Sequence, residues 1–264
     1  MTGQVVAITN QKGGVGKTTT SINLAASLAG LGDRVLLVDL DPQGNATTGS
    51  GVDKRALEHT LCDALLDPEL PFEALVQPTQ GGYDLLPANG DLVAAEVGLL
   101  ERPGREQQLK RVLRSAPTPY RWVLIDCPPA LSLLTVNALV ASTGVLIPMQ
   151  CEFYALEGLS ALLETLDGVR EHSNSSLEIL GLLRTMYDPR NGLTRDVSRQ
   201  LLTHFGDRVF RTVIPRNIRL AEAPSHGLPA VAYDRLSRGA VAYEALAQEL
   251  RRRPSRPAEE PAHP

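Results

Sequence analysis

The chain has 264 residues, of which 43% are hydrophobic, 21% charged and 4% aromatic. This length is enough for one large core, and the composition excludes a collagen-like, coiled-coil or predominantly disordered protein. The formal net charge is −4, yet the segment 208–253 holds nine arginines against four acidic residues. That local excess of positive charge makes the segment a candidate surface for a polyanion.

The cysteines and the N-terminus bear on the cellular compartment. Cys62, Cys127 and Cys151 are widely spaced, odd in number and not arranged as CxxC. We therefore expect neither a disulfide framework nor a zinc site, but three small buried side chains in a reducing cytosol. The first residues lack the basic segment of a secretory signal, and no apolar run approaches the roughly 20 residues that span a bilayer. These features predict a cytoplasmic protein without a membrane span.

Short apolar runs alternate with helical patterns along the chain. Buried strands are predicted at 5–8, 35–38, 122–125, 144–147, 179–183 and 209–214. A first helix is predicted from Lys17 to the glycines at 30 and 32, and later helices at 57–66, 104–115, 131–141, 154–171, 193–205 and 237–250. Strands that are apolar throughout and alternate with helices predict an α/β fold: a doubly wound, mostly parallel sheet with helices on both faces.

The domain organisation follows from the same pattern. No internal repeat or linker interrupts residues 1–253, which we expect to form a single domain. Residues 254–264 consist mainly of Pro, Arg, Glu and Ala, which cannot form a core, so we predict a disordered tail. Polar residues gather directly after the predicted strands. In a doubly wound sheet these loops share one edge, and ligands bind there.

A phosphate-binding loop is predicted between the first strand and the first helix, in the segment Lys12-Gly13-Gly14-Val15-Gly16-Lys17-Thr18-Thr19. Glycines let backbone amides turn toward phosphates, and the helix N-terminus adds unpaired amides and a positive dipole end. Lys17 is expected to reach the β- and γ-phosphates, and the Thr18 hydroxyl to bind Mg²⁺. The strict pattern GxxxxGK[ST] is broken because Gln11 occupies the first glycine position.

Three aspartates at strand ends complete the predicted site. Asp126 follows the third strand, where a Walker B aspartate holds Mg²⁺ through water. Asp39 and Asp41 follow the second strand two residues apart, so their side chains point the same way if the backbone stays extended. Asp41 is a candidate to orient or deprotonate the attacking water. Asp39 either binds the metal's water shell or stabilises its own loop, and an Asp-Pro turn remains the alternative reading of this segment.

These motifs together resemble the deviant Walker A ATPases of the MinD/ParA superfamily, and the chromosomal ParA/Soj proteins most closely. The resemblance runs from about residue 3 to 250 and rests on four segments: Asn10–Thr18, Asp39–Asn45, Asp126–Pro129 and Ile214–Gly227. It implies a P-loop NTPase fold, ATP and Mg²⁺ as cofactors, and ATP hydrolysis as the activity. It also implies that Lys12 is the signature lysine, which reaches the partner protomer's phosphates in an ATP-dependent homodimer.

The resemblance further assigns the nucleotide and metal ligands. Lys17 and Thr18 resemble the phosphate and magnesium ligands, Asp126 resembles the Walker B aspartate, and Asp41 resembles the aspartate needed for hydrolysis. The adenine is expected near Met186, Pro215 and Asn217.

Nonspecific double-stranded DNA and a ParB/Spo0J-type centromere-binding protein are the implied partners, which would place the protein on the nucleoid. Basic side chains in or near the C-terminal basic segment are the candidates for contacts with DNA phosphates: Arg190, Arg216, Arg219, Arg235 and Arg238. Arg190 and Arg219 match the family's DNA-binding positions best. For each arginine, a solvated surface or an intramolecular ion pair is the alternative reading.

Three other functions share the phosphate loop. A membrane regulator like MinD needs a basic amphipathic terminal helix, whereas four prolines follow residue 253. An iron–sulfur carrier needs paired cysteines, and Cys127 stands alone. A small-molecule kinase or ligase needs a substrate pocket and often an arginine-bearing lid. Liposome flotation, the colour of the purified protein and the response of ATP turnover to DNA or metabolites distinguish them.

Overall fold

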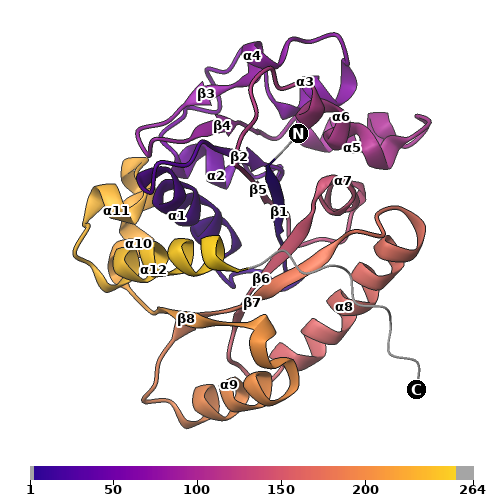
Figure 1. The fold of residues 1–264 in the computed structure, drawn as a ribbon. Helices are drawn as coiled ribbons and strands as arrows, with labels where there is room; N and C mark the ends of the chain where they lie inside the picture. Colours follow the sequence, from indigo (N-terminus) through magenta and orange to yellow (C-terminus); the bar gives the residue numbers. More distant parts are fainter. Residues whose placement is uncertain (1–2, 254–264) are drawn as a thin grey trace.

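A computed structural model describes residues 3–253, which contain one eight-stranded sheet with the order β3-β4-β2-β5-β1-β6-β7-β8 (Figure 1). The strands are β1 Gln4–Ile8, β2 Val35–Asp39, β3 Gln77–Pro78, β4 Asp84–Leu86, β5 Trp122–Asp126, β6 Gly144–Gln150, β7 Glu178–Tyr187 and β8 Val209–Pro215. Among the described strands, only β3 pairs antiparallel, with β4 at one edge. The predicted mostly parallel sheet is therefore confirmed, and the predicted tail 254–264 lies outside the described residues.

Helices cover both faces of the sheet, as predicted (Figure 1). Successive side chains of β1 alternate between two cores: Val5 and Ala7 face one, and Val6 and Ile8 face the other. The first core is closed by α3 Leu61–Leu66, α4 Phe72–Leu75, α5 Leu92–Leu99, α6 Gln108–Arg114, α7 Leu133–Ala141, α8 Ala155–His172 and α9 Gly192–Phe205. The second is closed by α1 Lys17–Gly30, α2 Asn45–Gly49, α10 Ile218–Glu222, α11 Ala230–Tyr233 and α12 Arg238–Arg252.

All six predicted strands are present, but β3 and β4 were missed. These two strands have two and three residues, too few to show a period in sequence. The prediction of a helix over 57–66 is wrong at its start: α3 begins at Leu61, because Thr60 and Asp63 form a capping box there. The predicted helix 104–115 is divided into the 3₁₀ turn η1 Arg105–Gln107 and α6. Two further 3₁₀ turns are η2 Gly206–Arg208, before β8, and η3 Ala223–His226, after α10.

The topology brings the predicted site residues to one edge of the sheet. β1 lies between β5 and β6, and β5 also pairs with β2. The parallel registers set Ile8 and Asp39 beside Asp126, each at the carboxyl end of its strand. Because the loops after these strands start from the same level, the glycine-rich loop and the aspartates must converge.

Two expectations from composition can be compared with the structure. Cys62, Cys127 and Cys151 are free thiols and all are buried, as predicted. No helix within residues 3–253 combines the length and apolar character that a bilayer crossing requires.

The second core predicts a matched pair of stability effects on α12. Leu246 is fully buried and Val241 is 51% exposed on the same helix. Leu246→Ala should lower the free energy of unfolding by about 2–5 kcal/mol, since it removes apolar contacts and leaves a cavity. Val241→Ala should change it by less than about 0.5 kcal/mol. Urea denaturation followed by circular dichroism measures both, and equal effects would contradict the packing described here.

Candidate phosphate-binding site

The loop between β1 and α1 has the backbone that a phosphate cradle requires. Gly14 and Gly16 have φ values of 74° and 89°, which disfavour any residue with a Cβ. Gly16 caps α1 without a side-chain hydrogen bond, so the first amides of the helix rely on other acceptors. A Cβ placed on Gly13 would meet no atom within 4 Å, so the space in front of the loop is open. The loop therefore presents amides and a helix N-terminus to an anion.

Lys17 is the buried cation of this loop. Its side chain is largely enclosed, and Nζ donates a hydrogen bond to the Lys12 carbonyl oxygen at 3.2 Å. Burial lowers the pKa of Lys17, and the nearby negative charge of Asp126 opposes this effect. A buried ammonium that lacks a direct carboxylate partner is suited to an anionic ligand, because the ligand's charge replaces the hydration that burial removed.

Asp126 lies behind the loop with one carboxylate oxygen unpaired. Oδ1 accepts a hydrogen bond from Ser21 Oγ at 2.9 Å, whereas Oδ2 is buried and has no partner within residues 3–253. Burial, followed by the charge of Asp39, raises the pKa of Asp126 to about 8, although hydrogen bonds from Thr18 and Ser21 lower it. A buried acceptor without a donor is costly in a folded protein and points to a missing cationic or hydrogen-bonding group.

These oxygen ligands fit Mg²⁺. The cation prefers hard oxygen ligands and keeps several of its waters. The Thr18 hydroxyl and the unpaired Asp126 oxygen are ligands of this kind, and the two side chains are within hydrogen-bonding reach of each other behind the loop. Mg²⁺ would supply positive charge to neutralise phosphate oxygens there.

Asp39 is bound to its own loop. Oδ2 accepts hydrogen bonds from the Thr47 amide and from Thr47 Oγ1, both at 2.7 Å, and Oδ1 accepts one from the Asp41 amide at 3.3 Å. Burial raises the pKa of Asp39 to about 6, and the hydrogen bonds from Thr47 oppose the shift. These contacts favour loop stabilisation, the second of its two predicted roles, while a metal role remains a prediction.

Asp41 is half-buried and more accessible than Asp39. Its Oδ1 accepts a hydrogen bond from the Gln43 amide at 2.9 Å, which fixes the turn after β2. Its charge acts on Lys17, so the side chain lies close to the loop. The structure thus brings Asp41 to the site predicted for it.

Lys12 forms an ion pair that the sequence did not reveal. Its Nζ donates to Glu152 Oε2 at 2.6 Å, and both side chains remain 40–50% exposed. The Lys12 amide also donates to Asn10 Oδ1 at 2.9 Å. The outer end of the loop is therefore tied to the segment after β6, by a bond that solvent can weaken.

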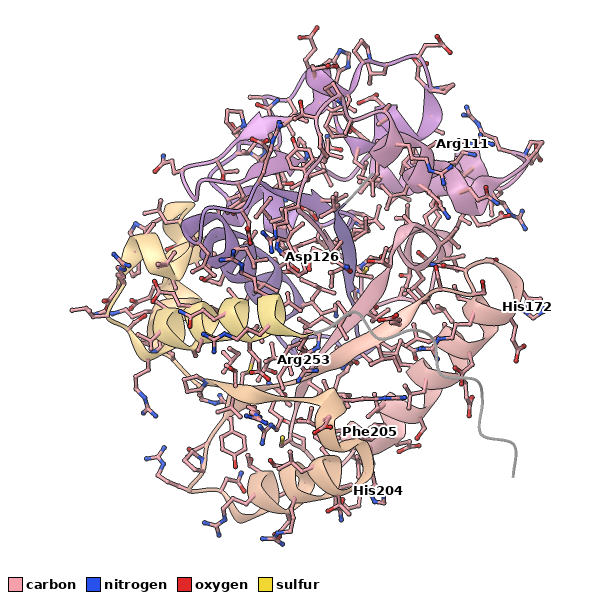
Figure 2. All side chains as sticks on the ribbon, in the orientation of Figure 1. Arg111, Asp126, His172, His204, Phe205 and Arg253 are labelled. Carbon is pink, nitrogen blue, oxygen red and sulfur yellow. The ribbon has the colours of Figure 1, made fainter. Side chains whose placement is uncertain are left out.

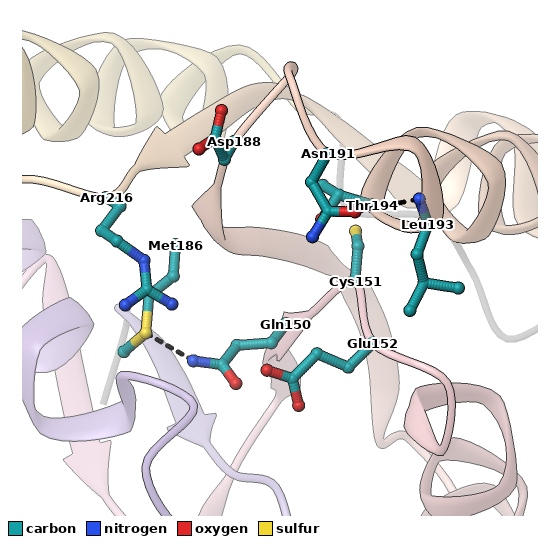
Figure 3. A pocket seen from close by; sticks show the side chains of 9 residues that line it. All are labelled: Gln150, Cys151, Glu152, Met186, Asp188, Asn191, Leu193, Thr194 and Arg216. Carbon is teal, nitrogen blue, oxygen red and sulfur yellow. Dashed lines mark hydrogen bonds between the residues drawn. The ribbon is translucent and has the colours of Figure 1, made fainter.

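The predicted adenine region borders a small polar cavity. The cavity has a volume of about 280 Å³, and Met186 and Arg216 line it (Figure 3). Met186 has a φ of 48°, unusual for a residue with a side chain, and its sulfur contacts Gln150 Nε2. Pro215 pairs with Tyr187, next to Met186, in the β7–β8 ladder. The Asn217 side chain caps α10 by accepting from the Arg219 amide at 3.0 Å.

The predicted DNA-binding arginines differ in their partners. Arg190 is 89% exposed and forms a two-pronged pair with Asp188, which lowers the pKa of Asp188 to about 2. Arg219 pairs with Glu222 at 2.8 Å and with Asp234 at 3.2 Å. A weaker pair joins Arg235 to Glu244. Arg216 and Arg238 form no ion pair within residues 3–253. Three of the five arginines thus form the intramolecular ion pairs of the alternative reading, but exposed pairs are easily exchanged for phosphate, so DNA contact by all five stays a prediction.

Sequence reasoning missed three residues that shape the site. Ser21 lies one helical turn after Lys17, so its position on the inner face of α1 could have been inferred from the i, i+4 spacing. Glu152 follows β6 at the same sheet edge as the other polar loops, which was an available signal. Thr47 offers no such signal, because its bonds to Asp39 depend on how α2 folds back onto β2.

The central β1, the glycine-rich loop and the strand-end aspartates define a P-loop nucleoside triphosphatase. A family model described as an AAA domain matches residues 3–179. The sporulation initiation inhibitor Soj of Bacillus subtilis is 52% identical over 94% of this chain and 98% of its own, and the chromosome-partitioning ATPase Soj of Thermus thermophilus is 54% identical over 93% and 94%. The chain therefore belongs to the ParA/Soj family of chromosome-partitioning ATPases.

A solved structure supports the same architecture. A Mycobacterium smegmatis protein described as cobyrinic acid a,c-diamide synthase, with bound ATP analog and magnesium, superposes with a TM-score of 0.83. It is 40% identical and the match covers 95% of each chain. The predicted P-loop fold is confirmed by this likeness.

The buried carboxyls predict a pH-dependent stability. A folded pKa above the unfolded value of about 4 contributes stability at low pH that is lost as the pH rises through the folded pKa. For Asp39 and Asp126 these folded values are about 6 and about 8. In buffer without nucleotide or Mg²⁺, Asp126→Asn should therefore gain stability relative to the wild type between pH 5 and pH 9, by roughly 1.4 kcal/mol or more, since one pKa unit corresponds to that amount.

Urea denaturation at the two pH values measures this difference. Asp53→Asn, at an exposed carboxylate, is the matched control and should show no such trend. A constant difference between wild type and Asp126→Asn across this range would contradict the burial of Asp126.

Proposed function

We propose that this protein binds Mg²⁺ and ATP in the Lys12–Thr19 loop, binds DNA nonspecifically as an ATP-dependent dimer, and leaves the DNA after ATP hydrolysis during chromosome or plasmid segregation. One observation carries the proposal: a buried Lys17 and a buried Asp126 oxygen that has no hydrogen-bond partner lie at the same edge of the sheet. Phosphates and a hard cation satisfy both groups together. The names of the Soj relatives support the segregation role, and their identity of 52–54% exceeds the 40% of the diamide synthase.

The nucleotide ligands are assigned as the loop geometry suggests. The amides of the glycine-rich loop, from Gly13 to Thr19, hold the phosphates, and Lys17 contacts the β- and γ-phosphates. Thr18 and Asp126 hold Mg²⁺, with Asp39 behind them as a support of the loop or of the metal's water shell. Met186, Pro215 and Asn217 surround the base, since they lie at the adjacent ends of β7 and β8.

Hydrolysis is assigned to Asp41. Its carboxylate is half-buried, lies near Lys17 and is less constrained than that of Asp39. Such a group can orient a water molecule toward the γ-phosphate and accept its proton. A ParB/Spo0J-type partner accelerates this step by completing the arrangement around Asp41.

Dimerisation is assigned to Lys12. Two protomers that face each other across their nucleotides place Lys12 next to the partner's triphosphate, where its charge is neutralised. To reach it, Lys12 must leave Glu152, and an exposed ion pair of this kind costs about 0–1 kcal/mol to break. The γ-phosphate supplies the difference in binding between the two states that any such switch requires.

DNA binding is assigned to the C-terminal basic segment and Arg190. Arg219 lies between Glu222 and Asp234, so DNA must displace carboxylates to engage it. Arg216 and Arg238 are available without that exchange. A dimer presents two such surfaces. Contacts that are individually weak can therefore hold the dimer on DNA, and a protomer that leaves the dimer is released from the DNA.

The nucleotide site is tested by Lys17→Ala. We expect binding of fluorescent ATP, measured by anisotropy in the presence of Mg²⁺, to fall by at least about 100-fold, because a charge-assisted contact to buried phosphate is lost. Lys110→Ala on α6 is the control and should bind ATP as the wild type does. Unchanged affinity in Lys17→Ala would place the nucleotide elsewhere.

The DNA cycle is tested with Asp41→Ala as the background. This variant should bind ATP, remain dimeric and stay on random-sequence DNA, as gel filtration and a DNA-retention assay measure. Adding Arg219→Ala should weaken retention equally on all sequences and reduce the salt dependence by about one unit of log–log slope per lost phosphate contact. Arg114→Ala, an exposed arginine on α6, is the control. Sequence-dependent losses, or a monomeric double variant, would remove Arg219 from the DNA surface.

A further inference from the structure

A second surface of the molecule is apolar where water should favour polar side chains. Val93, Val97 and Leu100 are 55%, 64% and 52% exposed. Their spacing of four and three residues puts Val93 and Val97 on the outer face of α5, with Leu100 at its C-cap on the same side. The inner face of the same helix, with Leu92, Ala95 and Leu99, is fully buried in the first core. Helix α5 is therefore apolar on two opposite faces, and only one of them has a partner.

Five cations follow the end of this helix in the sequence. The segment 102–114 holds Arg102, Arg105, Lys110, Arg111 and Arg114 against the single acid Glu106. The Arg105 guanidinium donates to the Leu100 carbonyl oxygen, and Arg102 Nη1 donates to the Leu66 carbonyl oxygen at 2.6 Å. Arg111 Nη2 lies beside Gly104, within 3.4 Å of where a Cβ would stand. Figure 2 shows Arg111 at the rim of the molecule, far from the central Asp126.

None of these five cations forms a salt bridge within residues 3–253. This distinguishes them from Arg190, Arg219 and Arg235, whose charges are balanced by carboxylates of the same chain. The net charge of −4 conceals this basic segment, and the sequence analysis identified only the arginines of 208–253 as a basic surface. Cations that lack a carboxylate partner and lie next to exposed aliphatic side chains can bind an acidic partner without displacing an internal carboxylate, although Arg102, Arg105 and Arg111 donate hydrogen bonds to neutral oxygens of the chain.

We propose that α5 and α6 form a docking surface for an acidic amphipathic segment of a partner protein. The surface, defined here as the α5–α6 surface, consists of Val93, Val97 and Leu100 with Arg102, Arg105 and Arg111. Charge complementarity identifies the occupant: apolar side chains at helical spacing would pack on α5, and flanking carboxylates would pair with the guanidinium groups. DNA would leave the aliphatic stripe without a role, and three aliphatic side chains without an aromatic give little area for a bilayer.

The α5–α6 surface is linked to the helix that follows the Asp126 loop. Glu96 of α5 accepts a hydrogen bond from the Leu133 amide at the start of α7. Asn137 of α7 accepts from the Leu109 amide at 3.1 Å and donates to the Arg105 carbonyl oxygen at 2.8 Å. Figure 1 shows α5 and α6 beside α7, on the side of the sheet away from α12. A segment bound here would contact α5 and α6, which are hydrogen-bonded to α7, the helix that follows the loop of Asp126.

The test uses the full chain and a synthetic probe. The probe is an 18-residue fluorescent peptide with leucines at i, i+4 and i+7 of a helix and glutamates on both flanks. Two matched probes replace the glutamates by lysines or the leucines by serines. Anisotropy titrations at low and physiological salt compare the wild type with Val97→Ser, with the charge reversal Arg105→Glu/Arg111→Glu, and with Val241→Ser, at another exposed valine, on α12.

We expect the wild type and Val241→Ser to bind the acidic peptide, and both α5–α6 variants to lose affinity by about tenfold or more, the effect of losing one well-packed side chain or charge pair. The lysine and serine probes should bind far more weakly. Thermal melts and ATP binding should be unchanged in all variants, which separates this result from the test of the nucleotide site.

Three results would overturn the proposal. The first is failure of the wild type to bind the acidic peptide. The second is that the α5–α6 variants keep their affinity for the peptide but no longer bind vesicles of phosphatidylcholine and phosphatidylglycerol. This result would make the surface a membrane contact. The third is a tenfold loss of duplex DNA affinity in the charge reversal with peptide affinity intact, which would assign the surface to DNA.

Discussion

The structure depends on one constraint: three ionisable side chains are buried where the strands β1, β2 and β5 end. Lys17, Asp39 and Asp126 cannot all be removed from water unless each finds a compensating partner. Asp39 finds one in Thr47 and thereby fixes the turn that carries Asp41. Ser21 pairs with one of the two carboxylate oxygens of Asp126, and Lys17 pairs only with a carbonyl oxygen. The remaining deficit makes the edge a site for a ligand that carries negative charge together with a cation.

Buried and exposed charged groups differ in how easily their partners are replaced. Inside the site the polar groups are buried, so water cannot replace their hydrogen-bond partners. Outside it, Lys12 pairs with Glu152, Arg190 with Asp188 and Arg219 with Glu222, all at exposed positions where water competes. Exposed pairs are weak enough to be exchanged for the phosphates of a nucleotide or of DNA. The proposed cycle of dimerisation and DNA binding therefore needs no large rearrangement of the sheet, only the replacement of internal partners by external ones.

The errors of the sequence prediction have physical causes that can be named. Helix α5 was missed because it is apolar on two faces and shows no helical period, and the same property leaves Val93 and Val97 exposed. Strands β3 and β4 were missed because their length is below that of one clear alternation. The start of α3 was misplaced because Thr60 and Asp63 set it, a local hydrogen-bond choice that hydrophobic pattern does not report.

The sequence by itself determined the class of fold, the six main strands and the loop Lys12–Thr19, because these depend on local pattern: apolar runs, helical spacing and glycine conformations. It also placed Asp39, Asp41 and Asp126 at strand ends. Only the tertiary structure decided which of these carboxylates keeps a free oxygen, that Lys12 rests on Glu152, and which arginines are already paired. Those outcomes depend on contacts between residues far apart in the chain, and a hydrogen bond between Asp39 and Thr47, or between Ser21 and Asp126, forms only once the strands have aligned.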